Sequence, residues 1–353
     1  MSQALFIYHL IAILVTGVAG LFLYQMREHR PVSRTLLVGI LLLFGLALTA
    51  IFFPVDGFAR IQLLAWEVFL YFPLFLLLGT CFFWNNTRRL AVGLMILLIV
   101  TLLVAVDSFL IEPQWLTVTE MEITSHKIEK PLTLAVLADI QTDSPGEYEK
   151  RVLEIVNERN PDLILLAGDY LQTRDPVEYQ RESGILNQIL IDADLTAPLG
   201  IYAVRGNVDR NNWRDLFQGL EVETFVETET VDLGPIMLTG VGWLDSADPS
   251  LQIGGNEKFH IVLGHSPNYS LGEIQADLLL AGHTHGGQVK LPGIGPLLTI
   301  SVVPRSWASG LTEIEPGKYL LVSRGIGLER GYAPRMRFLC RPELIILTLK
   351  PSD

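Results

Sequence analysis

Four long apolar stretches in the first third of the chain limit what it can fold into. They run over residues 4–24, 36–53, 63–83 and 90–110, and each has few charges over about 18–21 residues. A helix needs about 20 apolar residues to cross a bilayer. One such stretch could be a core helix of a soluble protein, but four in succession, joined by short loops, predict four transmembrane helices over residues 1–112.

The basic residues between these stretches predict an orientation. The first loop has three arginines, the third has two and the second has one: Arg27, Arg30 and Arg34; Arg88 and Arg89; and Arg60. Short loops rich in basic residues stay in the cytoplasm. We therefore expect a multi-pass protein of the cytoplasmic (plasma) membrane, with everything after residue 112 outside the cytoplasm.

The charge of the chain is unevenly divided. Residues 1–112 hold five acidic and six basic residues, which leaves 33 of the 38 acidic and 20 of the 26 basic residues for the rest. An acidic soluble part argues against nucleic-acid binding through a broad basic face. The two cysteines, Cys81 and Cys340, form no disulfide framework, and we expect both to be small buried apolar residues.

Glu67 lies inside the third apolar stretch. Acidic residues within membrane helices often have a function. Glu67 is also only about one helical turn from the start of its stretch, so its side chain could reach the membrane surface instead. Both interpretations remain open from the sequence.

The pattern after residue 112 is that of an α/β domain. Residues 113–131 contain the alternating segment QWLTVTEMEIT, which predicts a lead-in strand and linker. In residues 132–353, short apolar runs such as TLAVLAD, DLILLAGD and DLLLAGHTH end in glycine or polar residues, as strands buried on both faces do. Two segments between the runs have helical spacing, so a layered α/β domain with a mixed sheet is expected. Residues 286–316, rich in Gly and Pro, predict a structureless surface loop.

Polar side chains follow these apolar runs at the points where the runs end. In open α/β sheets, the loops at the carboxyl ends of the strands build the site. Carboxylate, amide and imidazole groups together suit divalent metals such as Mn²⁺, Fe²⁺ or Zn²⁺. The candidate metal ligands are Asp139, Gln141, Asp169, Asn207, His265, His283 and His285.

The two histidines of GHTH, His283 and His285, are spaced for a pair of ions. Residues at i and i+2 can each face a different ion when the ions are close. Two-metal hydrolytic sites hold their ions about 3.5–4 Å apart. We therefore expect each histidine to bind one of two divalent cations.

The ordered set D-x-Q, GD, GN, GH and GHTH resembles the calcineurin-like metallophosphoesterase family, in particular its bacterial membrane-anchored branch. LAGHTHGGQVKLPG and the tail SRGIGLERGYAPRMRFLCRPELIILTL resemble characteristic motifs of that branch. The resemblance covers about residues 115–350. It implies a four-layer α/β/β/α sandwich with a two-metal centre that hydrolyses phosphate esters.

The resemblance also assigns roles to the ligands. It implies that Asp139, residue 141 and His285 hold the first metal, that Asn207, His265 and His283 hold the second, and that Asp169 bridges them. Asp169 and Asn207 are then the residues expected to act in catalysis. A hydroxide between the ions would attack phosphorus while the metals neutralise the charge that builds on its oxygens.

Two positions depart from the family pattern. Gln141 replaces a histidine, and an amide oxygen binds Zn²⁺ less well than imidazole does. Val208 replaces the histidine that commonly protonates the leaving group or steadies the phosphate. General acid catalysis is worth about 10²–10⁴-fold in rate. Asp209 and Asp143 are the nearest candidates in sequence to supply the proton instead.

Two functions from different classes follow. The first is a membrane-anchored phosphoesterase for phosphate mono- or diesters, with lipid-linked phosphates among its expected substrates and membrane lipid as a partner. The second is a weakened or inactive metal-binding interaction or sensor module, which Gln141 and Val208 favour. Four arginines could bind a phosphate: Arg205, Arg210, Arg324 and Arg335.

Overall fold

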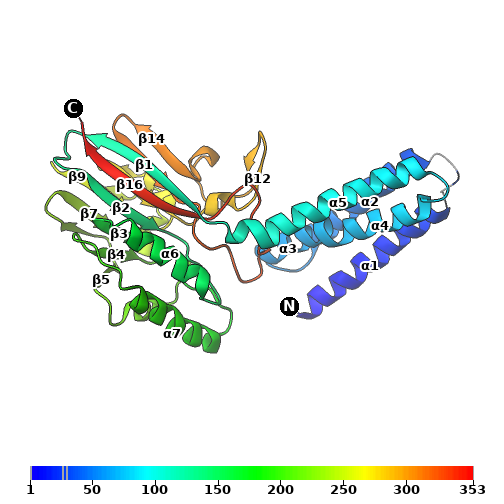
Figure 1. Ribbon diagram of the computed structural model, residues 1–353, viewed down its shortest axis with the longest axis horizontal. Coiled ribbons are helices and arrows are strands. Elements are labelled where there is room, and N and C mark those ends of the chain that lie inside the picture. The colour runs from blue at the N-terminus through cyan, green and yellow to red at the C-terminus, as the bar shows by residue number, and fades with distance from the viewer. Residues whose placement is uncertain (1, 26–27, 29–30, 353) are drawn as a thin grey trace. The chain divides into compact units, whose positions relative to one another are not determined.

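The computed structural model describes residues 2–25, 28 and 31–352 (Figure 1). Arg27, His29 and Arg30 of the first loop lie outside the described residues. The chain divides into two compact units, residues 1–110 with Gly331–Pro334, and Ile111–Arg330 with Arg335–Asp353. Each unit is described separately.

The first unit is helical. Its elements are α1 (Ser2–Gln25), α2 (Pro31–Phe52), α3 (Gly57–Trp66), the π-helical turn η1 (Glu67–Tyr71), α4 (Phe72–Phe83) and α5 (Arg88–Val106). The turns η2 (Asp107–Ile111) and η3 (Glu112–Gln114) extend the last helix. Four segments are long and apolar enough to cross a membrane: Gln3–Gln25, Pro31–Phe52, Gly57–Phe83 and Arg88–Gln114. The prediction of four helices that are long and apolar enough to cross a membrane is confirmed.

The structure shows whether Glu67 and Cys81, two residues of these helices, are buried. Glu67 is buried, and its carboxylate accepts a hydrogen bond from the hydroxyl of Tyr8 on α1. The carboxylate therefore joins two helices of the bundle and does not reach its surface. Cys81 is exposed, which contradicts the expectation that it is buried, whereas Cys340 is buried as expected. Cys81 lies on the outer side of α4. In a membrane-spanning helix that side contacts lipid, which is compatible with a small apolar side chain.

Two six-stranded sheets form the frame of the second unit. The first has the order β1 (Thr117–Ser125), β16 (Glu343–Pro351), β2 (Leu132–Leu137), β3 (Leu163–Leu166), β4 (Ile201–Val204) and β5 (Val222–Phe225). The second has the order β14 (Gly310–Glu315), β15 (Lys318–Val322), β11 (Leu278–Ala281), β9 (Phe259–Leu263), β7 (Ile236–Gly240) and β6 (Glu229–Asp232). Strands β2 to β5 are parallel, as are β7, β9, β11 and β15. Their carboxyl ends therefore lie at one edge of each sheet.

The layers follow from where the apolar side chains pack. One core lies between the sheets, where Leu134 and Leu165 of the first contact the cluster of Ile261 and Leu280 of the second. Helices α6 (Glu147–Glu158) and α7 (Pro176–Ala193) cover the outer face of the first sheet. The predicted four-layer arrangement is confirmed. Its fourth layer consists of short elements: α8 (Trp243–Ser246), η5 (Pro267–Leu271), β8 (Gln252–Ile253) and β10 (Glu273–Ile274).

The segment predicted to be a structureless loop, residues 286–316, has local structure. It contains the hairpin of β12 (Lys290–Leu291) and β13 (Gly295–Pro296), the turn η7 (Arg305–Trp307) and strand β14. The prediction was wrong because strands of two residues are too short to give an alternating pattern. The turn η6 (His285–Gly287) lies at the start of this segment. Thr284, just before the turn, connects it to the later part of the segment, since its hydroxyl donates to Ala308 O at 2.7 Å.

Candidate metal centre

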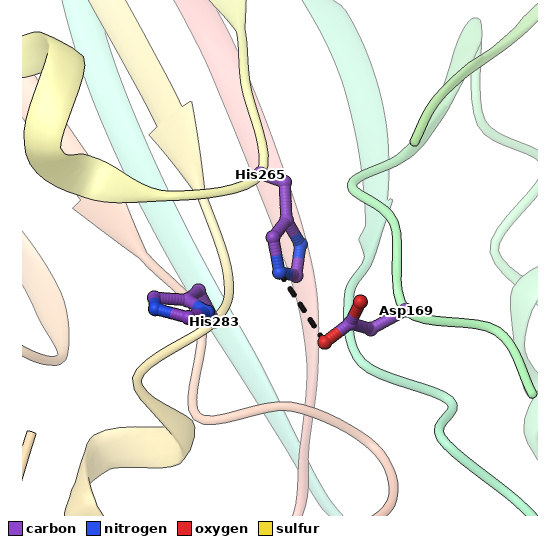
Figure 2. Close-up of side chains that lie close together, drawn as sticks. All are labelled: Asp169, His265 and His283. Carbon is purple, nitrogen blue, oxygen red and sulfur yellow. Dashed lines mark ion pairs between the residues drawn. The ribbon is translucent and has the colours of Figure 1, made fainter. Parts of the chain in front are cut away.

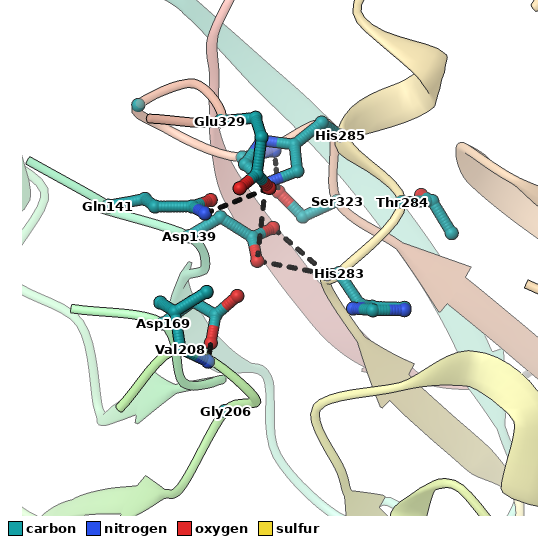
Figure 3. A network of polar contacts seen from close by, with 12 residues as sticks. Asp139, Gln141, Asp169, Gly206, Val208, His283, Thr284, His285, Ser323 and Glu329 are labelled. Carbon is teal, nitrogen blue, oxygen red and sulfur yellow. Dashed lines mark hydrogen bonds and ion pairs between the residues drawn. The ribbon is translucent and has the colours of Figure 1, made fainter. Parts of the chain in front are cut away.

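The candidate ligands come from the carboxyl ends of strands in both sheets. Asp139 and Gln141 follow β2, Asp169 follows β3 and Asn207 follows β4, all in the first sheet. The remaining ligands follow β9 and β11 of the second sheet: His265, His283 and His285. Six of the seven are labelled in Figures 2 and 3, where the ends of the two sheets meet, and Asn207 lies within hydrogen-bond distance of His265 and His283.

The backbone at these positions is strained. Five of the seven candidates have left-handed backbone angles, with φ between 35° and 69°: Asp139, Gln141, Asp169, His283 and His285. Left-handed angles are uncommon for residues other than glycine. Strain of this kind persists only where the surrounding structure enforces it, and it gathers at functional sites. The strand ends are therefore bent to aim side chains at a common point.

Asp169, His265 and His283 present ligand atoms within 4.8 Å of one another. His265 Nε2 lies 3.3 Å from Asp169 Oδ2, the contact dashed in Figure 2. Asn207 joins them, because its Oδ1 lies 2.9 Å from His265 Nε2 and 2.7 Å from His283 Nδ1. One amide oxygen therefore faces two imidazole nitrogens.

A backbone carbonyl lies beside each imidazole. His265 Nδ1 lies 2.8 Å from Ala167 O and His283 Nε2 lies 3.1 Å from Ile300 O. The opposite nitrogens, His265 Nε2 and His283 Nδ1, face Asn207. Metal-binding histidines usually donate their outward N–H to such a carbonyl, so the nitrogens that face Asn207 are the ones that would bind a metal.

The charges of the two imidazoles differ. Burial opposes protonation of His265, but the carboxylates of Asp169 and Asp139 outweigh it and raise the pKa of His265 to about 9. Burial and the positive charge on His265 lower the pKa of His283 to about 4, so His283 is neutral at pH 7. The neutral ring has one proton and two oxygen neighbours that only accept, Asn207 Oδ1 at 2.7 Å from Nδ1 and Ile300 O at 3.1 Å from Nε2. One nitrogen therefore presents a lone pair to an oxygen, and a cation bound by His283 Nδ1 and Asn207 Oδ1 would remove that repulsion.

The second group of candidates contains Asp139, Gln141 and His285. Burial raises the pKa of Asp139, although the backbone N–H of His283 donates to both of its carboxylate oxygens at 2.9 and 3.1 Å. His285 Nε2 lies 4.0 Å from Asp139 Oδ1. Among the described residues, neither Gln141 Oε1 nor His285 Nδ1 has a hydrogen-bond partner, and both atoms are buried. Buried polar atoms nearly always have partners, so these two fit a site for a cation.

Glu329 and Gln172 orient the Gln141 amide, and the sequence analysis missed both. Gln141 Nε2 donates to Glu329 Oε2 at 3.1 Å and to Gln172 Oε1 at 3.0 Å. Gln172 Nε2 in turn donates to Glu329 Oε1 at 2.7 Å. Because carboxylate and carbonyl oxygens accept only from the NH₂ group, these bonds determine that Oε1 is the end of the amide that does not contact Glu329 or Gln172. Figure 3 shows the contact between Gln141 and Glu329. No local sequence pattern predicts this contact, because Gln141 and Glu329 are 188 positions apart.

Asp209 braces the loops that carry Asp169 and Asn207. Its carboxylate accepts the backbone N–H groups of Asp169, Tyr170 and Gly206, each at 2.8 Å. A side chain on Gly206 would not fit, since a Cβ atom there would lie 2.1 Å from Asp169 Oδ1. Asp209 is therefore not a proton donor for a leaving group, because its oxygens are turned toward the backbone and buried.

The other candidates for substrate contacts are also engaged. Asp143, the second candidate proton donor, pairs with Arg335 and lies 3.7 Å from Arg330 Nε. Each of the four arginines predicted to bind phosphate has a partner: Arg205 donates to Asp209 O, Arg210 lies over Tyr179, Arg324 pairs with Glu343 and Arg335 pairs with Asp143. Val208 contributes its backbone, whose N–H donates to Asp169 Oδ1 at 2.9 Å.

Comparisons with known proteins agree with this arrangement. Residues 132–287 match the family described as calcineurin-like phosphoesterase. An uncharacterised metallophosphoesterase of Aquifex aeolicus is 28% identical over 262 residues, which cover 68% of this chain and 94% of that protein. Phosphodiesterase YaeI of Escherichia coli is 26% identical over 249 residues, covering 67% and 90%.

A similar combination of parts occurs in a vertebrate protein. The transmembrane protein with metallophosphoesterase domain of Danio rerio is 26% identical over 287 residues, which cover 72% of this chain and 62% of that protein. That protein is described as transmembrane with a metallophosphoesterase domain, and this chain has four helices long and apolar enough to cross a membrane ahead of the region that matches the phosphoesterase family.

The orientation of Gln141 leads to a prediction about metal affinity. We expect calorimetric titration of the metal-depleted protein with Mn²⁺ to resolve two unequal sites, the weaker one at Asp139, Gln141 and His285. Glu329→Gln should weaken that site by roughly 10–100-fold, as loss of a group that orients a ligand typically does, and leave the other unchanged. Gln141→His should increase the Mn²⁺ affinity of the weaker site. In that variant, Glu329→Gln should reduce the affinity less than in the unmodified protein, because no amide remains to orient.

Glu147→Gln is the matched control, because this exposed glutamate contacts only Lys150 among the described side chains. It should change neither affinity. Two sites of equal strength, or equal losses at both sites on Glu329→Gln, would contradict this account of the Gln141 amide.

Proposed function

Because this chain contains a calcineurin-like metallophosphoesterase domain, we propose that it is a membrane-anchored hydrolase of phosphate mono- or diesters that acts at the outer face of the cytoplasmic membrane. The observation that carries the proposal is the convergence of acceptor atoms at the ends of the two sheets. Asn207 Oδ1 and His283 Nδ1 face each other at 2.7 Å, and Gln141 Oε1 and His285 Nδ1 are buried without partners among the described residues.

The donor set suits two divalent cations, Mn, Fe or Zn. Asp139, Gln141 and His285 would hold one, Asn207, His265 and His283 the other, and Asp169 would contact both. When bound, the pair of ions would activate a water molecule and neutralise charge on the phosphoryl oxygens. The chain's contribution is to fix these side chains before substrate arrives.

Asn207 is the candidate that reaches solvent. Its Oδ1 is turned toward two histidines, so its Nδ2 group points away from them and can donate to a phosphoryl oxygen. A donor that is already in place stabilises charge that grows in the transition state without the cost of reorganisation. We therefore assign Asn207 a direct contact with substrate and Asp169 the role of holding the centre together.

The leaving group receives no proton from the positions expected to supply it. Val208 has no titratable group, and Asp209 and Asp143 are held by other partners. Substrates whose leaving groups are stable as anions are therefore favoured, such as phenolates or phosphates.

The tether supports a substrate held at the membrane. The domain carries all of the chain's acidic excess, with 33 acidic against 20 basic residues, which disfavours nucleic acid and other free polyanions as substrates. A phosphate ester linked to a lipid meets a tethered site without diffusing through solution. We therefore propose lipid-linked phosphate esters as the substrate class and membrane lipid as a partner.

An inactive metal-binding interaction or sensor module is the alternative. Gln141 and Val208 favour it, because each replaces a histidine typical of the family. The orientation of the Gln141 amide favours the enzyme, because Glu329 and Gln172 present its oxygen to the site, as a working ligand requires.

Hydrolysis of an activated ester separates the two functions. The purified full chain with Mn²⁺ should cleave bis-(p-nitrophenyl) phosphate, and chelation should abolish the activity. His265→Ala should lower kcat/KM by roughly 100-fold or more, because it removes a ligand from the centre that stabilises transition-state charge. His126→Ala, at an exposed histidine in the turn after β1, should have no effect. Metal binding without hydrolysis would favour the sensor.

The missing proton donor predicts a steep dependence on the leaving group. Across a series of aryl and alkyl phosphodiesters, the logarithm of kcat/KM should fall steeply as the pKa of the leaving group rises, because the departing oxygen keeps its negative charge. A flat plot, with chemistry shown to be rate-limiting, would mean that another residue supplies the proton.

The side of the membrane on which residues 113–353 lie can be measured directly. A reporter enzyme that folds only outside the cytoplasm should be active when fused to the C-terminus, because the first and third loops carry most of the basic residues. Activity of a reporter that works only in the cytoplasm would contradict the proposed outer location.

A further inference from the structure

Residues 293–303 form an ordered loop whose apolar side chains face solvent. Five large apolar residues are between 41% and 67% exposed: Ile294, Leu297, Leu298, Ile300 and Val302. The loop is nonetheless anchored, because Leu297 N donates to Val289 O at 3.1 Å and Val302 N donates to Asn268 Oδ1 at 3.1 Å. A cluster of exposed apolar residues indicates a surface that contacts another protein, a ligand or a membrane.

This loop is part of the wall of the candidate metal centre. The carbonyl oxygen of Ile300 lies 3.1 Å from His283 Nε2. Ile300 has a φ of 48°, a left-handed angle that is exceptional for a β-branched residue. The strain turns the carbonyl toward the site and leaves the side chain 59% exposed beside it. A molecule whose phosphate lies at His283 therefore has apolar surface next to it.

Residues just before this loop are connected by hydrogen bonds to the end of the fourth apolar segment. Lys290 N donates to Phe338 O at 2.9 Å, and the next residue, Leu339, donates its N–H to Glu112 Oε2 at 2.9 Å. Glu112 belongs to the segment Arg88–Gln114, the last of the four that can cross a membrane. Cys340 extends the connection, because its N–H also donates to Glu112 and its thiol to His285 O at 3.3 Å.

Exposed apolar residues continue at this junction. Leu339 is 53% exposed and Trp115 is 50% exposed, with the guanidinium of Arg341 over the Trp115 ring. Tryptophan is enriched at the level of the lipid head groups, where its ring is partly apolar and partly hydrated. Hydrogen bonds within the second unit thus connect the start of the apolar loop and His285 to Glu112, which lies near the end of the segment Arg88–Gln114.

We propose that residues 293–303 dip into the surface of the anchoring bilayer, and that the centre takes the phosphate ester of a lipid whose acyl chains remain in the membrane beside the loop. The inference rests on the proposed phosphoesterase function for its substrate and on the loop alone for its membrane contact. The loop then sets specificity, since it gains apolar contacts only with esters that are held in a bilayer.

Fluorescence quenching tests the membrane contact without any need for activity. The full chain, with Cys81→Ala to remove its exposed cysteine, is reconstituted in phosphatidylcholine nanodiscs and labelled with an environment-sensitive dye at Ile294→Cys. Brominated phosphatidylcholine should reduce the emission roughly twofold if the label lies 5–10 Å into the head-group boundary. Val177→Cys, 77% exposed at the start of α7, is the control and should not be quenched. Equal emission changes at both positions would overturn the proposal.

Two substrates with the same leaving group test the specificity. One is bis-(p-nitrophenyl) phosphate in solution, and the other is a diacylglycerol p-nitrophenyl phosphodiester in the nanodisc. The double variant Ile294→Ser, Val302→Ser should lose roughly tenfold in rate on the lipid ester, through lost burial of two side chains, and keep its rate on the soluble ester. Val177→Ser with Leu244→Ser, at two other exposed apolar positions, should keep both rates.

The outcomes separate the two proposals. Equal rate losses on both esters, or none on the lipid ester, would overturn the role of the loop and leave phosphoesterase activity standing. Failure of the unmodified protein to cleave either ester would overturn the proposed function, while the quenching result would still decide whether residues 293–303 contact lipid.

Discussion

Acceptor atoms that converge at the ends of the two sheets are the constraint on which the candidate site depends. His283 Nδ1 lies 2.7 Å from Asn207 Oδ1 and His283 Nε2 lies 3.1 Å from Ile300 O, and His283, with its pKa lowered to about 4, has one ring proton at pH 7 for these two oxygens. Gln141 Oε1 is buried without a partner among the described residues. Lone pairs that face one another repel, and we infer that bound cations remove this repulsion.

The remaining architecture holds these atoms in place against that repulsion. Carbonyls of Ala167 and Ile300 fix the imidazoles, and Glu329 fixes the Gln141 amide. Asp209 collects three backbone N–H groups from the loops after β3 and β4. The left-handed backbone at the strand ends costs about 1–3 kcal/mol for each residue, a cost that the buried core between the two sheets offsets.

The sequence predicted the parts of the site that depend on local pattern. Asp139 and His283 could be found because each ends an apolar run that must be a buried strand, and parallel strands bring such ends together. Glu329 and the carbonyl of Ile300 could not be found, because their roles depend on contacts with residues 188 and 17 positions away. Asp209 was wrongly considered as an acid, since sequence shows proximity to Val208 and not the direction of a side chain. The hairpin at residues 290–296 was missed because its strands are too short to have a period.

The central claim is that two cations hold these acceptor atoms together, and anomalous X-ray scattering from crystals of the Mn²⁺-loaded full chain tests it most directly. We expect two anomalous peaks about 3.5–4 Å apart. One should be bonded by Asn207, His265 and His283, the other by Asp139, Gln141 Oε1 and His285, with Asp169 contacting both. A single peak, or a Gln141 amide turned to present its nitrogen to the ion, would contradict the account.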